Sequence, residues 1–315
     1  MQKKIAVMLK KQVLFVILVA IVLAFSLSSD RFFQLDNLLL ILRQVTIVGM
    51  LAIGLTFVVV GGNMDLSIGA IVSLITVVTV RMHDQVGPLP AVIIALAIGL
   101  LCGCITGFLV GYLKLNGMIT TLGMQNIITA TALIYTGNMY YGIRQPAPWF
   151  YDLSRGAVAG IPLPLIICIS LIAVMQFILS KSLYGKRIIA VGNNPLCSNY
   201  SGISSKKVIM RSYMLSGLFA AIGGLVLTSR SLAGMTDAGV GMEFDALTGV
   251  ILGGTSLMGG SGNILKSFIG VLIIGILKNG FLLLGWSDYI QWIAQCVIIV
   301  AVVWIDIASK RRSSK

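Results

Sequence analysis

The stretch that decides the fold is GGNMDLSIGA, residues 61–70, which places an asparagine and an aspartate between two long runs of isoleucine, valine and leucine. Its two leading glycines favour the end of a helix, because glycine weakens a helix interior. Asn63 or Asp65 can then cap the helix that follows, since both residue types accept hydrogen bonds from free backbone N–H groups. Whether Asp65 does more than cap depends on its surroundings.

The composition places the chain in a lipid bilayer. Of its 315 residues 57% are hydrophobic and 10% are charged, and the mean hydropathy is +1.00. A soluble domain carries about 25% charged residues. Several apolar runs approach the length of a membrane-spanning helix. These runs are 13–27, 41–60, 66–80, 91–112, 118–136, 163–180, 212–228, 246–258, 264–280 and 290–305. Because backbone groups in lipid must be satisfied internally, the runs predict an all-α, polytopic membrane protein of about ten transmembrane helices.

The net charge of +13 reflects how the chain is oriented in the membrane rather than binding to nucleic acid. Nucleic acid is not an expected partner. If the N-terminus is cytoplasmic, most cations fall at the cytoplasmic ends of the runs, as the positive-inside rule requires. These are Lys3, Lys4, Lys10, Lys11, Lys114, Lys181, Lys186, Arg187, Lys206, Lys207, Arg211, Lys266, Lys310, Arg311, Arg312 and Lys315. Only Asp65 and Asp306 among the acids lie on that side. The pattern predicts an even number of crossings and two cytoplasmic termini.

Only two connections between the runs are long. Residues 137–162 are rich in proline, glycine and aromatic residues, and the count of crossings places them outside. Residues 181–207 are basic, and the same count places them in the cytoplasm. Since neither connection can hold a core of its own, we expect residues 1–315 to form a single membrane domain.

A faint internal repeat suggests that this domain has two halves. The pattern G-x-x-x-D-x-x-x-G occurs at 61–69 and at 241–249, where it opens the third and the eighth run. The fourth run ends in GYLKLNG at 111–117, and the ninth ends in GILKNG at 275–280. Two sequence motifs, each repeated five segments later, indicate two inverted five-helix halves, an architecture common among transporters. A chance origin stays open, because the chain has 35 glycines.

The sequence contains almost none of the residue patterns that enzymes use. His83 is its one histidine and lies in a short turn that we expect outside. The sequence has no cluster with metal-ligand spacing, no nucleophile elbow and no phosphate-binding loop. Catalytic residues, a metal and a cofactor are therefore not expected. Any ATP hydrolysis that drives the protein would take place on a separate chain.

Two polar islands are the candidates for a translocation pathway. A charge at the bilayer centre costs at least about 2.5–3.5 kcal/mol, so such residues usually line cavities or helix breaks. Three functions of Asp65 stay open: a cap alone, a cap that also lines the pathway, or an ion ligand. The second island, within 241–270, either lines a water-filled path or packs closely through its glycines. We expect short or broken helices near 61–66 and 246–263. The candidate residues are Asn63, Asp65, Ser67, Asp245, Thr255 and Ser256.

Four separated motifs resemble the ribose-type permeases of bacterial ATP-binding cassette sugar importers. They are GGNMDLSIGA, AVGNNPLCSNYSGI, GMEFDALTGVILGGTSLMGGSGN and LIIGILKNGFLLLGWSDYIQ, and the resemblance covers residues 32–306. It implies a ten-helix permease that pairs with a second permease subunit, either a copy of itself or a related chain. It also implies a cytoplasmic ATPase, typically two fused cassettes, and a periplasmic or lipid-anchored sugar-binding protein. The location implied is the bacterial plasma (inner) membrane.

The resemblance also implies that residues 190–203 dock on the ATPase. Within them Asn194 can cap a short helix, Pro195 suits its first turn and Gly202 can stop it. Tyr200 is the expected aromatic anchor and Ile203 keeps the family pattern, whereas Pro195 and Tyr200 depart from the usual alanine- and threonine-rich stretch. A solvated basic loop that only holds topology is the alternative.

These features predict the membrane permease of an importer for a monosaccharide, a ribose-like pentose or a hexose. A permease for nucleosides or other small polar solutes from the same superfamily is the nearest alternative. An ion-coupled secondary transporter with Asp65 as its ion site is a more distant one.

Overall fold

The computed structural model describes residues 2–137, 139–287, 289–294, 296–297 and 300, and these residues are almost entirely helical. The all-α prediction is confirmed. The first half contains α1 (Gln2–Ser28), α2 (Leu35–Val60), α3 (Ile68–Val86), α4 (Pro88–Gly111), α5 (Gly117–Thr136) and α6 (Pro148–Arg155). The second half contains α7 (Leu163–Lys181), α8 (Leu183–Asn193), α9 (Pro195–Tyr200), α10 (Ser205–Ser231), α11 (Met242–Leu252) and α12 (Ile264–Leu283).

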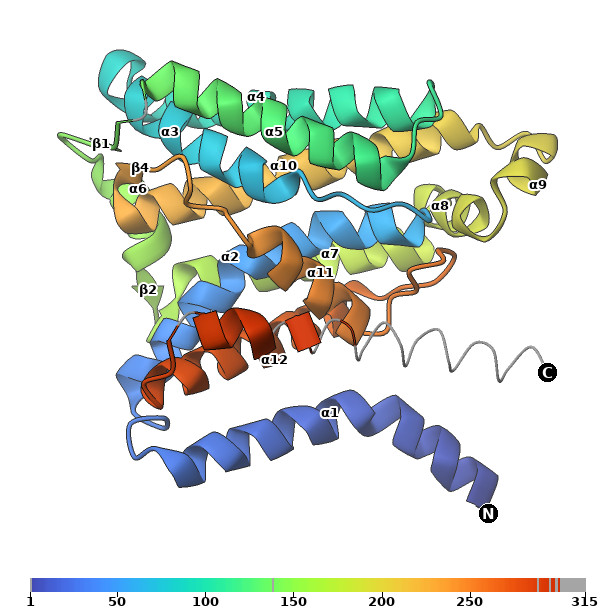
Figure 1. Cartoon of the computed structure of the whole chain (residues 1–315), viewed down its shortest axis with the longest axis horizontal. Helices are drawn as coiled ribbons and strands as arrows, with labels where there is room; N and C mark the ends of the chain where they lie inside the picture. The colour runs from blue at the N-terminus through green and yellow to red at the C-terminus, as the bar shows by residue number, and fades with distance from the viewer. Residues whose placement is uncertain (1, 138, 288, 295, 298–299, 301–315) are drawn as a thin grey trace.

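Four strands of two residues each close the connections. Strand β1 (Tyr141–Gly142) pairs antiparallel with β4 (Ala233–Gly234), and β2 (Ala157–Val158) pairs with β3 (Ile161–Pro162). All of them lie with α6 at one end of the bundle, while α8 and α9 lie at the opposite end (Figure 1). We refer to these ends as the α6 end and the α9 end.

Six of the described helices are long and apolar enough to cross a membrane: α2, α4, α5, α7, α10 and α12. The chain is therefore a multi-pass membrane protein. The count of ten crossings stays a prediction, because α3 and α11 are shorter or less apolar and the run at 290–305 lies only partly among the described residues. The terminal cations Lys310, Arg311, Arg312 and Lys315 lie outside the described residues.

Several observed helices are longer than the predicted runs: α10 begins at Ser205 instead of 212, and α3 ends at Val86 instead of 80. Helix α3 therefore contains His83, which was expected in a turn and is 6% exposed.

Helix α11 differs at both ends. The run was expected at 246–258, but the helix begins at Met242 and ends at Leu252. It begins earlier because Glu243 and Asp245 occupy its first turn, where acids interact favourably with the helix dipole. It ends earlier because Gly254 adopts a φ of 83°, a conformation that suits glycine and cannot continue a helix.

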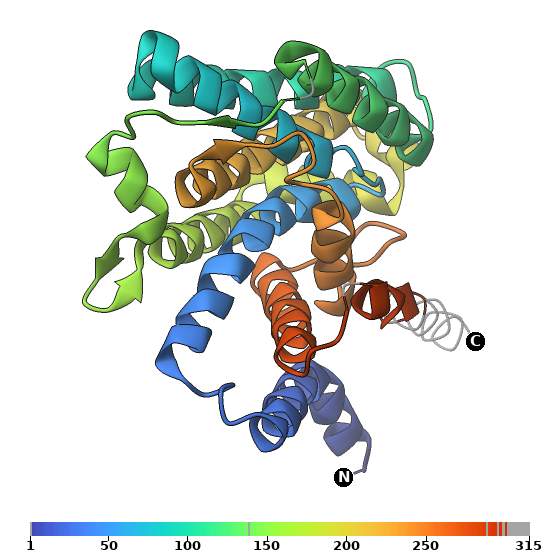
Figure 2. The ribbon, with the colours of Figure 1, turned by 60° about the vertical axis from the view of Figure 1, so that its left-hand side comes forward.

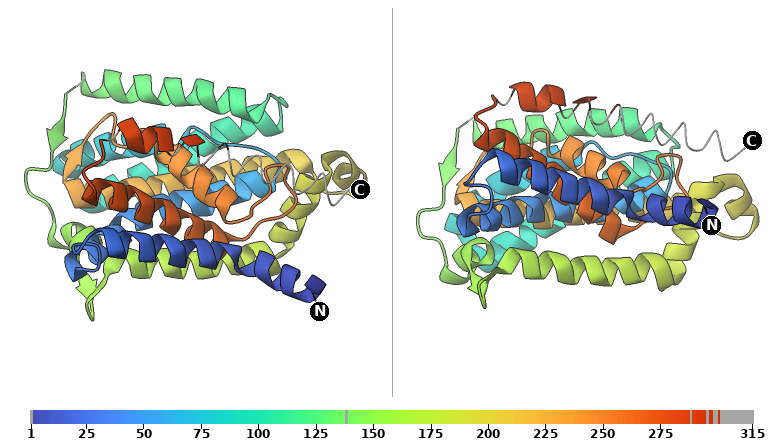
Figure 3. Two further views of the ribbon diagram at one scale, coloured as in Figure 1. Left: turned by 60° about the horizontal axis from the view of Figure 1, so that its bottom comes forward. Right: turned by 90° about the horizontal axis from the view of Figure 1, so that it is seen from below.

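Helices α2 and α10 form the centre of the bundle and run in opposite directions along it (Figures 1 and 3). Helix α10 packs on α4, α2 and α3, and α2 packs in turn on α12 and α11. Small residues permit this close approach: a Cβ on Gly103 would meet the Tyr213 carbonyl oxygen, and one on Gly217 would meet that of Gly99. Figure 2 shows α1 at the edge of the bundle, where it contacts α12.

The packing has a two-fold pattern. Helix α3 contacts α4 and α10, just as α11 contacts α12 and α2. Exchanging α2, α3 and α4 for α10, α11 and α12 therefore reproduces the main contacts, with the direction of each helix reversed. This is the arrangement that two inverted halves require.

Candidate functional site

The break between α2 and α3 is held in place by α10. Helix α2 ends at Val60, Gly62 adopts a φ of 78°, and α3 begins at Ile68. The side chain of Asp65 is 1% exposed. Its Oδ1 accepts hydrogen bonds from the Ser67 backbone N–H (3.0 Å) and the Ser67 hydroxyl (2.6 Å), and its Oδ2 accepts one from the Ser216 hydroxyl (2.7 Å). The buried carboxylate is thus satisfied by three donors.

The capping predicted for this break is only partly correct. Ser67 is the residue that precedes α3, and its side chain makes no capping bond to the helix. The amide of Asn63 donates to the Gly61 carbonyl oxygen at 3.1 Å instead of capping α3. Asp65 does satisfy the Ser67 N–H, but it also bonds to α10. The sequence therefore indicates the local bond, whereas the partner on α10 is 151 residues away.

The second break follows α11 and is packed against protein over part of its length, whereas Gly254, Met258 and Ser261 are exposed. Its turns depend on Gly254, Gly259 and Gly260, all at positive φ. The Gly260 N–H donates to the Val60 carbonyl oxygen at 2.8 Å, so the loop sits on the end of α2. This contact buries part of the irregular backbone against protein, as the interior of a membrane requires.

Thr255 and Ser256, both predicted site residues, lie in this loop and are buried. The Thr255 and Ser267 hydroxyls are 3.2 Å apart, and Thr56 on α2 donates to the Ser267 hydroxyl at 3.1 Å. The Ser256 N–H donates to the Ser261 carbonyl oxygen at 3.0 Å, which closes the turn.

The N-termini of α3 and α11 contact each other in the interior of the bundle. Gly69, in the first turn of α3, has no room for a side chain, because a Cβ there would lie 2.6 Å from the Gly239 carbonyl oxygen and against the Glu243 carboxylate. The Gly239 N–H donates to the Ser73 hydroxyl at 2.9 Å. We call this contact the half-helix junction. Discontinuous helices whose positive N-termini face one another are typical of solute sites in transporters.

Glu243 gives the half-helix junction its charge. The residue is 2% exposed, and Gln125 of α5 donates to its Oε1 over 3.5 Å. Its Oε2 makes no hydrogen bond within the part of the chain that the structure describes. The junction therefore holds a buried carboxylate oxygen without a hydrogen-bond partner among the described residues. Sequence reasoning did not select Glu243 as a site residue, because Gly69 and Gln125 lie far from it in the chain.

Asp245 lies on the opposite side of α11 from Glu243, since two residues correspond to about 200° of helix rotation. Lys278 of α12 forms an ion pair with its Oδ2 at 2.5 Å. Both belong to the repeated motifs, but Lys114, the counterpart of Lys278 in the first half, is exposed and makes no ion pair with a described residue.

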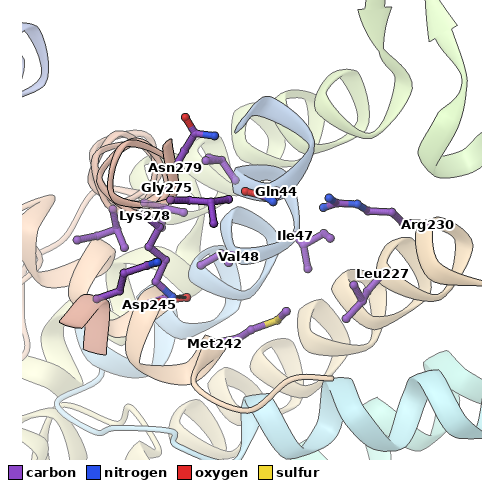
Figure 4. Close-up of a pocket in the computed structure, with 15 residues that line it drawn as sticks. Gln44, Ile47, Val48, Leu227, Arg230, Met242, Asp245, Gly275, Lys278 and Asn279 are labelled. Atoms are coloured by element: carbon purple, nitrogen blue, oxygen red, sulfur yellow. Dashed lines mark hydrogen bonds and ion pairs between the residues drawn. The ribbon is translucent and has the colours of Figure 1, made fainter. Parts of the chain in front are cut away.

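A cavity of about 350 Å³ opens beside this ion pair, between α2, α10, α11 and α12 (Figure 4). Its lining is mostly apolar, with polar groups from several helices. The lining residues are Gln44, Val45, Ile47, Val48, Leu227, Arg230, Met242, Asp245, Val271, Ile274, Gly275, Lys278, Asn279, Leu282 and Gln291. Of the predicted site residues, only Asp245 borders it.

The predicted short helix of the basic connection is confirmed as α9. Asn194 accepts hydrogen bonds from the N–H groups of Leu196 (3.0 Å) and Cys197 (2.9 Å), Pro195 is the first helical residue, and Gly202 adopts a φ of 80°. The Ile203 N–H then donates to the Ser198 carbonyl oxygen at 2.9 Å, which fixes the exit from α9.

Tyr200 projects from α9 and is 85% exposed, and Leu196, one turn earlier, is 64% exposed. Together they form an apolar pair at the α9 end of the molecule. Helix α8 anchors this pair to the bundle, because Ile188 and Val191 are fully buried and Gly192 packs against the end of α2. The sequence predicted Tyr200 as an anchor and missed Leu196.

A bundle of bilayer-length helices with two broken members and an exposed helical element at one end defines a multi-pass membrane transport protein. The chain belongs to the family described as branched-chain amino acid transport system / permease component, whose model matches residues 37–303. It is therefore a transport permease subunit.

Similar proteins cover nearly the whole chain. The ribose import permease protein of Haemophilus influenzae is 36% identical over 295 residues, which span 93% of this chain and 91% of the relative. That of Escherichia coli K12 is 34% identical over 300 residues, covering 94% and 92% of the two chains. That of Bacillus subtilis is 37% identical over 288 residues, covering 91% and 89%. No solved structure matches the chain.

Proposed function

We propose that this chain is the membrane permease subunit of an ATP-binding cassette importer that takes up a monosaccharide, ribose or a sugar close to it. The observation that carries the proposal is the similarity to ribose import permeases over nine-tenths of this chain. The family, a permease component of transport systems, agrees with this assignment. The chain itself would carry out no chemistry, and ATP would be hydrolysed on a partner chain.

The exposed pair Leu196 and Tyr200 supports docking of that ATPase at the α9 end. A helix of six residues is not stable alone in water, so α9 depends on α8 and on whatever covers its apolar side chains. We assign Asn194, Pro195, Gly202 and Ile203 to shaping this element and Tyr200 to contact. In this proposal the α9 end is cytoplasmic, both termini lie on the same side, and the α6 end with 137–162 faces outward. The whole chain, residues 1–315, then acts as one domain in the bacterial inner membrane.

The remaining partners follow from the same class of importer. A second permease subunit, identical or related, would complete the transport path. A periplasmic or lipid-anchored binding protein would deliver the sugar to the α6 end, and the ATPase would consist of two fused cassettes.

We place the sugar's path at the half-helix junction, where Glu243 and Gln125 offer hydrogen-bonding groups in a buried setting. Asn63, Asp65 and Ser67 shape the start of α3 beside it. Thr255 and Ser256 hold the loop after α11, and Asp245 holds α11 to α12. This division gives the six predicted pathway residues a positioning function, with solute contact assigned to Glu243.

The function is tested by uptake into proteoliposomes that contain the permease with its co-purified ATPase. We expect labelled ribose, or a close pentose or hexose, to enter only when ATP and a loaded binding protein are both supplied. Uptake of a nucleoside in place of the sugar would favour the alternative permease function. Sugar uptake driven by a proton or sodium gradient without ATP would show a secondary transporter and refute the proposal.

A further inference from the structure

Three arginines gather at the α6 end without an acidic partner. Arg43 of α2 donates from Nη2 to the Arg155 carbonyl oxygen at 3.3 Å, and Arg155 donates from Nη2 to the Arg230 carbonyl oxygen at 3.0 Å. The charges of Arg43 and Arg155 both act on the guanidinium of Arg230. We call these residues the arginine cluster. Neither ion pair of the described residues involves any of them.

The backbone carbonyls account for part of this arrangement. Arg155 and Arg43 donate to carbonyl groups in the last turns of α10 and α6, where helix dipoles favour cations. The guanidinium of Arg230 itself, however, makes no hydrogen bond or ion pair with a described residue, and the Nε of Arg43 is buried without a partner among these residues. An unpaired buried donor of a charged group is costly. The arginine cluster is therefore electrostatically incomplete.

The cluster borders the cavity beside α11. Arg230 extends from α10 toward α2 across this cavity and faces Gln44 (Figure 4). Beyond Arg230 the wall is largely apolar and includes Val45, Val48 and Ile274. Arg230 is the second-last residue of α10, a bilayer-length helix, so the cluster lies at the depth of lipid headgroups.

We propose that the arginine cluster and the adjoining cavity bind an anionic phospholipid, with its phosphate at Arg43, Arg155 and Arg230 and an acyl chain against the apolar wall. Guanidinium groups bind phosphate through paired charge-assisted hydrogen bonds. Gln44, which also lines the cavity, can bond to the hydroxyl groups of a glycerol headgroup. Phosphatidylglycerol combines a phosphate, acyl chains and the hydroxyl groups of a glycerol headgroup. Phosphatidylcholine brings a cation that the arginines repel.

The test uses the full chain reconstituted in nanodiscs of phosphatidylcholine, with or without phosphatidylglycerol, and measures the unfolding temperature. A ligand that binds only the folded state raises that temperature. We expect a rise with phosphatidylglycerol in the wild type and its loss in Arg230→Gln and Arg43→Gln. Arg31→Gln is the matched control, because Arg31 is an exposed arginine between α1 and α2, also at the α6 end, and its variant should keep the rise.

A second variant separates the headgroup from the acyl chain. Val48→Phe adds bulk to the cavity wall and leaves the arginines in place, so it should also lose the rise with phosphatidylglycerol. The proposal is overturned if phosphatidylglycerol raises the unfolding temperature of Val48→Phe as much as that of the wild type. It is also overturned if the rise is the same in Arg230→Gln, Arg43→Gln and Arg31→Gln. An equal rise with inorganic phosphate alone overturns it too, since the site would then be one for a soluble anion. An arginine-dependent rise with polyglutamate but not with phosphatidylglycerol would instead assign the cluster to an acidic protein partner. None of these outcomes depends on which solute is transported.

Discussion

Ser216 donates a 2.7 Å hydrogen bond to the buried carboxylate of Asp65 and so joins α10 to the break between α2 and α3. Two further donors from Ser67 complete the coordination of that carboxylate. Asp65 therefore fixes the position of a half-helix relative to α10.

Asp65→Asn should keep most of the uptake and stability, whereas Asp65→Leu should lose both. Asparagine retains one oxygen for the two Ser67 donors, and its amide can donate to the Ser216 hydroxyl. Leucine leaves buried donors unpaired, at about 1–3 kcal/mol each. Thermal unfolding and sugar uptake of the two variants measure the difference. Equal and complete loss of uptake in both variants, with uptake driven by an ion gradient, would favour an ion site at Asp65.

Tyr200→Asp should leave the permease folded and inserted but weaken its hold on the ATPase. Loss of an aromatic anchor at an interface costs about 2 kcal/mol or more, which is roughly 30-fold in affinity. Co-purification of the ATPase and uptake should both fall. Tyr140→Asp is the control for co-purification, since Tyr140 is 66% exposed at the opposite, α6 end and its variant should keep the ATPase. Wild-type transport by Tyr200→Asp would contradict the docking proposed for α9.

Gly69→Ala should abolish transport or folding, because the added Cβ would meet Gly239 and Glu243 at the half-helix junction. Gly123→Ala is its control: nothing lies within 4 Å of a Cβ there. Since alanine favours a helix over glycine by about 0.5–1 kcal/mol, that variant should be as stable as the wild type or slightly more stable. Membrane levels and unfolding temperatures distinguish the two. A tolerated alanine at Gly69 would show that α3 and α11 do not pack closely.

Lys278→Met should destabilise the protein more than the double variant Lys278→Met with Asp245→Leu. Removing one partner leaves a buried charge, whereas removing both does not. The Lys278 side chain is 36% exposed, so water screens the pair and the single variant should lose at most about 3 kcal/mol. Unfolding temperatures of the single and double variants provide the measurement. A double variant less stable than the single one would mean that the ion pair stabilises the fold outright.

Thiol labelling tests the proposed orientation. Cys197 is exposed on α9, and Val158, 57% exposed in β2, is suitable for an introduced cysteine. With the other cysteines replaced, a membrane-impermeant reagent should label Val158→Cys in intact cells and reach Cys197 only after permeabilisation. Ser154, in the same external segment, is a poor probe because it is 2% exposed. The reverse labelling pattern would show that the α9 end faces outward, opposite to the proposed topology.

The sequence predicted what short-range chemistry determines. The cap at Asn194, the first turn at Pro195 and the stop at Gly202 involve neighbours within a few residues, and all three are found in α9. The partners of buried polar groups were not predictable in this way. Ser216 lies 151 residues from Asp65, and only packing of α10 against the break brings them together.

The second break illustrates the same limit. Glycines between 253 and 262 predicted irregular backbone there, but not what covers it. The covering contacts come from Val60 at the end of α2 and from Gly192 of α8, neither of which carries a side-chain signal for such contact. The arginine cluster likewise brings together residues from three separate segments. In the sequence, each of the three arginines taken singly resembles an ordinary cation at the outer end of a helix.

Gly192 of α8 lies against the Val60 carbonyl oxygen and the Gly260 N–H, so one small residue touches both broken regions at once. A displacement of α8 cannot reach the end of α2 without also reaching the loop after α11. We therefore expect a displacement of α9 to move the end of α2 and the loop after α11 at the same time. Opening toward one side of the membrane and closing toward the other would then be a single event, with no stage in which only one half-helix has moved.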